Sequence, residues 1–356
     1  MKTGIIGAPQ VGKTSLFSML TQTEVQTGRQ QDLIGVARLP DARLDRLAER
    51  FQPQKLTHTS LELVDVGSLT PESLRDGTGI AALRSVDSLV HVLRAFPLYG
   101  TQLEEGEAHP ATDIRDLEFD LIVSDLGQVE KRLERLAKDL KKQRTPQLLA
   151  EADLLARMKL HVEAEQPLRS LALSRDEEKL MRGFQFLSQK PILYALNVGE
   201  AEAADLAGAP QRFGLAAAMQ APKTGAVAIC AKIEAEIASL PEAEAREFLA
   251  GYGLQEPGLT RLARAIYALL GLISFFTVGE DECRAWTIPR DTRAVEAAGA
   301  IHTDLSKHFI RAEVIAWDKL LELGSEAAAR DKGLLRLEGK DYIVQDGDVM
   351  HIRHSG

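Results

Sequence analysis

The sequence predicts a mixed α/β protein built around a nucleotide-binding sheet domain, and three observations support this prediction. A phosphate-binding loop lies between a short apolar run and a helical pattern at the start of the chain. Apolar runs typical of buried strands recur further on, with helical or turn sequence between them. A long segment with coiled-coil spacing interrupts this alternation and predicts an inserted antiparallel helical hairpin.

The phosphate-binding loop occupies residues 7–14 and fits the pattern G-x-x-x-x-G-K-[ST]. Its glycines let successive backbone N–H groups face one anion, and the following helix adds its positive end. Lys13 is predicted to reach the β- and γ-phosphates as the catalytic cation, and the Thr14 hydroxyl to ligate Mg²⁺. The predicted nucleotide contacts here are Gly7, Gln10, Val11, Gly12, Lys13, Thr14 and Ser15. The alternative interpretation of this segment is a glycine-rich turn before an ordinary helix, without a nucleotide site.

Four apolar runs predict the other strands of a mostly parallel sheet. They lie at residues 61–64, 88–93, 192–196 and 226–230. Asp65 follows the first run, where a carboxylate can hold Mg²⁺ through water. His91 lies inside the second run, and a core histidine satisfied by the backbone is favoured over a catalytic one.

The ends of the third and fourth runs predict the part of the site that reads the base. Residues 197–200 stand where GTPases carry N-K-x-D, whose Asp accepts two N–H bonds from guanine and whose Lys packs along the base. Here Val198 replaces the lysine, and Glu200 is one methylene longer than aspartate. We therefore expect ATP to bind at least as well as GTP. The predicted base contacts are Asn197, Val198, Glu200, Cys230 and Ala231. The alternative interpretation of Asn197 and Glu200 is that they are turn residues only.

The inserted hairpin is predicted from apolar residues spaced alternately three and four apart. This seam consists of Phe119, Ile122, Leu126, Val129, Leu133, Leu136 and Leu140. Residues 144–146 end the helix at a proline, and apolar residues between 148 and 162 supply an antiparallel partner. Ser174 and Glu177 form a capping-box pattern that opens the helix leading back to the sheet. Seven Lys/Arg against three acids over residues 130–144 predict a solvated face or a contact with RNA or the ribosome.

Composition indicates a cytoplasmic enzyme or switch. A chain of 356 residues with 45% hydrophobic content can bury a large core in more than one domain. Cys230 and Cys283 lie far apart, so neither a disulfide framework nor a zinc site is expected. The first residues run straight into the phosphate-loop strand, and no apolar run reaches the about 18 residues of a membrane helix, so we expect neither a signal peptide nor a membrane partner. The net charge of −9 argues against nonspecific nucleic-acid binding by the whole surface.

The segment from about residue 274 onward predicts a small binding module. Residues 284–288 and 313–317 are expected as strands flanking a helix near 295–301, and residues 346–348 form a turn signal. Trp286 and Trp317 are interpreted as core residues rather than ligand platforms.

Motifs along nearly the whole chain accompany the phosphate loop. They lie at residues 38–45, 91–96, 190–194, 197–200, 256–259, 284–287, 301–304 and 338–349. Together they resemble the YchF/Obg-like ATPase family of the translation-factor GTPases. The resemblance implies a Ras-like P-loop NTPase domain at 1–112 and 186–273, an inserted helical coiled-coil domain at 113–185, and a TGS domain of β-grasp type at 274–356. It also implies Mg²⁺-dependent binding of ATP or GTP, slow hydrolysis and a ribosomal partner, and we expect a monomer.

The sequence departs from this family at positions that matter for hydrolysis. Ser68 stands where the family's D-x-x-G carries the glycine that senses the γ-phosphate, and the second switch, residues 70–79, is shortened. Arg29 stands nearest the Mg²⁺-binding threonine of the first switch, with Thr27 as the nearest substitute. Leu69 occupies the position of the water-orienting glutamine. Two functions follow: a slow ATPase whose nucleotide state sets ribosome affinity, or a hydrolytically weak nucleotide-binding interaction protein.

Overall fold

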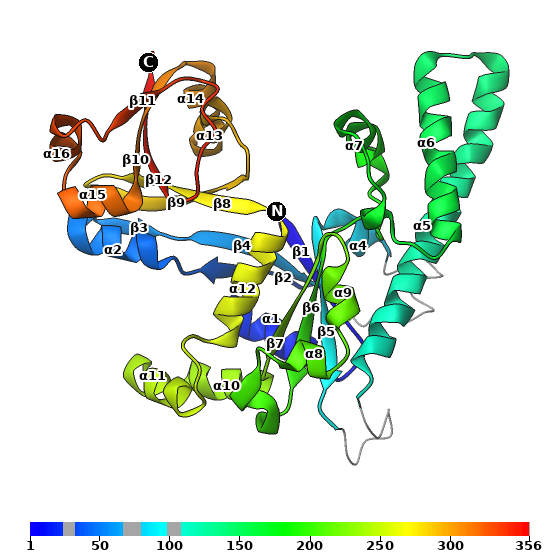
Figure 1. The fold of residues 1–356 in the computed structure, drawn as a ribbon, viewed down its shortest axis with the longest axis horizontal. Coiled ribbons are helices and arrows are strands. Elements are labelled where there is room, and N and C mark those ends of the chain that lie inside the picture. The colour runs from blue at the N-terminus through cyan, green and yellow to red at the C-terminus, as the bar shows by residue number, and fades with distance from the viewer. Residues whose placement is uncertain (24–32, 67–79, 98–107, 356) are drawn as a thin grey trace. The chain divides into compact units, whose positions relative to one another are not determined.

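The computed structural model describes residues 1–23, 33–66, 80–97 and 108–355. They form two compact units, one of residues 1–36 with 62–265 and one of residues 37–61 with 266–356. The described residues build two six-stranded sheets (Figure 1). The predicted mixed α/β fold is thereby confirmed.

The sheet of the first unit has the strand order β2-β4-β1-β5-β6-β7. Its strands are β1 (Lys2–Ile6), β2 (Leu33–Leu39), β4 (Thr59–Asp65), β5 (Ser88–Ala95), β6 (Ile192–Val198) and β7 (Thr224–Ile229). The neighbours from β4 through β1, β5 and β6 to β7 pair in parallel. All four predicted runs are strands. Both β5 and β6 are buried along their whole length, as expected where helices cover both faces of a parallel sheet.

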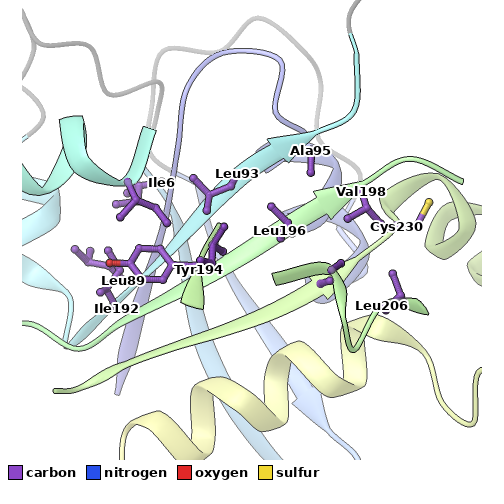
Figure 2. Packing of buried hydrophobic residues seen from close by; sticks show 14 of the residues in the cluster. Ile6, Leu89, Leu93, Ala95, Ile192, Tyr194, Leu196, Val198, Leu206 and Cys230 are labelled. Atoms are coloured by element: carbon purple, nitrogen blue, oxygen red, sulfur yellow. The ribbon is translucent and has the colours of Figure 1, made fainter. Parts of the chain in front are cut away.

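One face of this sheet carries two neighbouring rows of apolar side chains. They are Leu89, Leu93 and Ala95 of β5 and Ile192, Tyr194, Leu196 and Val198 of β6 (Figure 2). The connecting helices of the unit are α1 (Lys13–Thr21), α4 (Ile80–Ser85), η3 (Glu200–Asp205), α8 (Ala209–Arg212), α9 (Ala216–Gln220), α10 (Ala231–Ser239), α11 (Glu242–Gly251) and α12 (Gly258–Leu269). The parallel register pairs Ala95 with Val198, so the carboxyl ends of β5 and β6 lie side by side. This is the edge where parallel sheets bind ligands.

The hairpin consists of α5 (Pro110–Lys142) and α6 (Pro146–Glu163), which lie side by side (Figure 1). Five of the seven predicted seam residues belong to the apolar cluster of the hairpin, namely Ile122, Leu126, Val129, Leu133 and Leu136. Of these, Ile122, Val129 and Leu136 are at most 4% exposed. Thr145 begins α6 by accepting a hydrogen bond from the N–H of Leu148 at 3.2 Å. The seam prediction is wrong at Phe119, which is half exposed, because the apolar cluster of the hairpin begins one turn later.

A buried polar junction fastens the hairpin to the sheet. Asp125 of α5 is fully buried and accepts hydrogen bonds from the N–H of Leu187 at 2.9 Å and from the N–H and hydroxyl of Ser188, both at 2.7 Å. The chain reaches this junction through η1 (Leu168–Ser170), α7 (Arg175–Met181) and η2 (Arg182–Phe184). The predicted capping box of Ser174 and Glu177 is present at the start of α7. The junction thus holds the residues just before β6 against α5.

The sheet of the second unit has the order β11-β10-β12-β8-β9-β3. Its strands are β3 (Lys55–Thr57), β8 (Leu272–Val278), β9 (Glu282–Pro289), β10 (Phe309–Ala316), β11 (Arg336–Glu338) and β12 (Asp348–His354). Its helices are α2 (Ala42–Phe51), α13 (Ala294–Ile301), α14 (Thr303–Lys307), α15 (Trp317–Leu323) and α16 (Glu326–Asp331). The two predicted strands and the predicted helix of this region are present. The identification of this unit as a TGS domain stays a prediction.

Residues 37–61 belong to the core of the second unit, although the sequence placed them within the nucleotide domain at 1–112. Leu44 and Leu47 of α2 are fully buried against a cluster that includes Phe276. Arg43 holds the same helix by donating to Asp346 at 2.9 Å. Four apolar residues of this ten-residue helix pack in the cluster, and their spacing in the sequence does not show which sheet they will meet. The four-part division of the chain stays a prediction.

Candidate functional site

The phosphate loop follows β1 and leads directly into α1. Two of its glycines are required by their surroundings. A Cβ on Gly7, whose φ is 149°, would lie 2.5 Å from the carbonyl oxygen of Val92. Gly12 has φ 97°, and a Cβ there would lie 2.7 Å from the Asn197 side-chain nitrogen. The loop is therefore pressed against β5 and the end of β6, with Gln10 and Ser15 exposed.

Lys13 lies inside this loop and is only 7% exposed. Its ammonium donates to the carbonyl oxygens of Gly7 at 2.6 Å and Ala8 at 3.0 Å. Burial lowers the pKa of Lys13, and the charge of Asp65 opposes that shift. An anion bound in the loop would place further negative charge beside this buried ammonium and stabilise its charged form.

Thr14 and Asp65 come together although 51 positions separate them in the chain. The Thr14 hydroxyl donates to Asp65 Oδ2 at 3.2 Å, and Asp65 is 6% exposed at the end of β4. A hydroxyl and a carboxylate are the oxygen ligands that Mg²⁺ prefers, so the donor set fits this ion. No cluster of three or more His, Cys, Asp or Glu residues suited to another metal site occurs in the part of the chain that the structure describes.

Asn197 connects the two loops of the predicted site. Its side-chain nitrogen donates to the carbonyl of Val11 at 2.9 Å, and its oxygen accepts from the N–H of Ala231 at 3.0 Å. Both polar groups of the amide are thus engaged with the backbone. Asn197 ties the phosphate loop to the loop after β7, and its predicted contact with the base stays a prediction.

The remaining predicted base contacts differ in exposure. Val198 and Cys230 are each 2% exposed, and burial raises the pKa of the Cys230 thiol. Glu200, in contrast, is exposed and accepts a hydrogen bond from the Lys232 ammonium at 2.7 Å. That bond raises the pKa of Lys232. The sequence prediction omitted Lys232, although its place directly after Ala231 was a signal for it.

His91 lies beneath the phosphate loop on β5 and is 4% exposed. Burial lowers its pKa to about 3, and the charge of Lys13 adds to the shift. Its ring meets Tyr194 edge-on, with centroids 6.2 Å apart. This burial agrees with the prediction of a core histidine. The predicted hydrogen bond to the backbone is wrong for Nδ1, which has no hydrogen-bond partner among the described residues.

The predicted switch positions fall outside the described residues. This applies to Thr27, Arg29, Ser68, Leu69 and the segment 70–79. Their contribution to hydrolysis therefore stays a prediction.

Comparisons with known proteins indicate the same family. The family model YchF-GTPase_C, described as a protein of unknown function (DUF933), matches residues 272–355. The chain is 39% identical to the ribosome-binding ATPase YchF of Bacillus subtilis, covering 99% of both chains, and 40% identical to that of Pasteurella multocida, covering 99% of this chain and 98% of the other. The structure of the Schizosaccharomyces pombe YchF GTPase matches with a TM-score of 0.83 at 27% identity, covering 99% of this chain and 97% of the other.

Proposed function

The chain belongs to the YchF family, and from this premise we propose that it is a Mg²⁺-dependent ATPase whose nucleotide state controls its association with the ribosome. The observation that supports the proposal most directly is the meeting of Thr14 and Asp65 at 3.2 Å beside the glycine-bounded loop. Relatives named ribosome-binding ATPases support the partner. Binding to ribosomes would place the protein in the cytoplasm.

The residues of the site have separate roles in this proposal. The loop backbone and Lys13 bind the phosphates, and Lys13 stabilises negative charge on them as the bond to the terminal phosphate breaks. Thr14 and Asp65 would hold Mg²⁺, which supplies further positive charge to the phosphate oxygens. Asn197 keeps the phosphate loop and the base-side loop in register. Positioning and charge stabilisation account for such a reaction without a covalent intermediate on the protein.

The hairpin supports a ribosomal contact. Six of the seven basic residues predicted in its charged segment are exposed, namely Lys131, Arg135, Lys138, Lys141, Lys142 and Arg144. The seventh, Arg132, is engaged within the hairpin by Glu151 at 2.6 Å and 2.8 Å. Exposed cations concentrated near the tip of a long hairpin complement the negative charge of ribosomal RNA.

None of the described helices combines the length and the apolar character that crossing a bilayer requires.

We predict that ATP binds at least as tightly as GTP, because Val198 is buried and Glu200 is paired with Lys232. Isothermal titration of both triphosphates in the presence of Mg²⁺ measures the ratio. A preference for GTP of more than about tenfold, or ~1.4 kcal/mol, would contradict the prediction.

Single-turnover hydrolysis of ATP and GTP, with and without ribosomes, tests the proposed activity itself. Slow turnover that ribosomes alter supports it. Tight ATP binding without turnover under either condition would instead favour the alternative, a nucleotide-binding interaction protein without effective hydrolysis.

We also predict that intrinsic hydrolysis is slower than in relatives with an intact D-x-x-G. The reason is that the β-carbon of Ser68 restricts the turn needed to bring its N–H to the γ-phosphate, and that Arg29 replaces an Mg²⁺-binding threonine. The double variant Ser68→Gly with Arg29→Thr should raise the single-turnover rate. An unchanged rate would place the limit in residues 70–79 or in a missing partner.

A further inference from the structure

Lys190 is a buried cation on the segment that leads into β6. It is 9% exposed, and its ammonium donates to the carbonyl oxygen of Arg84 at 3.1 Å and to that of Val86. Arg84 lies in the last turn of α4, where carbonyl groups have no partner within the helix. Lys190 therefore caps the carboxyl end of α4 with a positive charge, which the polarity of that helix end favours.

The same segment is fixed to the hairpin just before Lys190. The N–H of Leu187 and the N–H and hydroxyl of Ser188 donate to Asp125 of α5. Residues 187–190 thus connect α4 with α5, two helices between which the chain passes through β5. Each connection consists of hydrogen bonds that involve a buried charged group.

Neither connection can be given up at low cost. Separating Lys190 from the end of α4 would leave a buried ammonium without these two acceptors. Separating Ser188 from Asp125 would leave a fully buried carboxylate without its donors. The end of α4, residues 187–190 and the adjoining turn of α5 are therefore expected to move together.

The helix α4 stands next to the part of the chain that responds to nucleotide in related enzymes. It begins at Ile80, directly after the predicted second switch at 70–79. In GTPases the γ-phosphate orders the switch segments, and hydrolysis releases them. A change of nucleotide would therefore reach α4 before it reaches the hairpin.

We propose that Lys190 is a positioning residue that couples α4 to the hairpin, so that the bound nucleotide sets the position of α5 and α6. This proposal rests on the proposed control of ribosome association by nucleotide state, and it names the contact through which the two sites communicate. Lys190 acts through α4 and has no contact with the nucleotide in this proposal. Because coupling between two sites is reciprocal, ribosome binding would act on the nucleotide site through the same contact.

Lys190→Met tests the coupling in the full-length protein, because methionine keeps a long side chain and lacks the ammonium group. Dyes on Gln143→Cys in the hairpin loop and Ala238→Cys on α10 report the position of the hairpin by energy transfer. Both introduced positions are exposed, whereas the native Cys230 and Cys283 are buried.

The transfer efficiency of the labelled protein should differ between its Mg²⁺-ADP form and its form with Mg²⁺ and the non-hydrolysable analogue AMP-PNP. Lys190→Met should reduce this difference by about twofold or more, while its affinity for AMP-PNP changes by less than about threefold. Sedimentation with ribosomes provides a second readout. The ratio of ribosome affinities in the two nucleotide states should move toward one in the variant, which a loss of stability alone would not produce.

Two further variants make the test specific. Lys159→Met is the matched control, because Lys159 pairs with Glu130 inside the hairpin at 2.9 Å, and it should keep the full difference. Ser188→Ala weakens the connection to Asp125 while Lys190 stays in place, and it should reduce the difference. Thermal unfolding monitors each variant, and Ser188→Ala decides the test if Lys190→Met does not fold.

The outcomes separate this inference from the function on which it rests. If folded Lys190→Met binds AMP-PNP and keeps the full difference, the role of Lys190 is refuted and nucleotide binding stands. The coupling is also refuted if the hairpin of the protein with Lys190 intact takes the same position with both nucleotides. If that protein binds no triphosphate, the proposed function fails and this inference fails with it.

Discussion

Replacing Lys13 with alanine should weaken ATP binding by about a hundredfold or more, because it removes a charge-assisted contact to the phosphates that is worth roughly 3 kcal/mol. The fold should persist. Lys13 donates to the carbonyls of Gly7 and Ala8, and both belong to the loop that receives the ligand. Titration with ATP and Mg²⁺ measures the affinity, and circular dichroism monitors the fold.

Lys179→Ala is the matched control, because it removes a lysine that is 69% exposed on α7. It should leave ATP affinity unchanged. Undiminished binding by Lys13→Ala would remove this lysine from the phosphate site. Global unfolding of that variant would show that the loop supports the core and is not merely built for a ligand.

Replacing Asp125 with alanine should destabilise the first unit by about 3–5 kcal/mol, since it leaves several buried donors without their charged acceptor. The donors are the N–H of Leu187 and the N–H and hydroxyl of Ser188. The same hydroxyl accepts from the N–H of Leu168 at 3.1 Å, so the disturbance should also reach η1. Amide hydrogen exchange at Leu187 and Ser188 should accelerate strongly.

Asp153→Ala provides the comparison, because Asp153 is exposed on α6 of the same hairpin. Its exchange pattern at Leu187 and Ser188 should match the wild type. If Asp125→Ala left protection at these two amides intact, water or a neighbouring group would be satisfying them, and the junction would not depend on the carboxylate.

Sequence patterns determined those parts of the protein whose physical causes are local. Glycine spacing around Lys13 predicted the phosphate loop, because the backbone turn and the helix start that bind an anion are properties of a short segment. Continuous apolar runs predicted the parallel strands, since strands buried on both faces need apolar side chains at every position. The threonine and proline at 145 and 146 likewise predicted where the hairpin turns.

Only the tertiary structure decided which distant segments meet. The apolar face of α2 has no sequence feature that specifies a sheet, and packing against Phe276 and its neighbours assigns it to the second unit. In the same way, Asn197 became a connector because Val11 and Ala231 lie within reach of its amide. The pairing of Glu200 with Lys232 arises because parallel pairing of β6 with β7 brings the ends of both strands to one edge of the sheet. Local pattern determines what a segment can form, and close packing of segments remote in sequence determines what its side chains are free to bind.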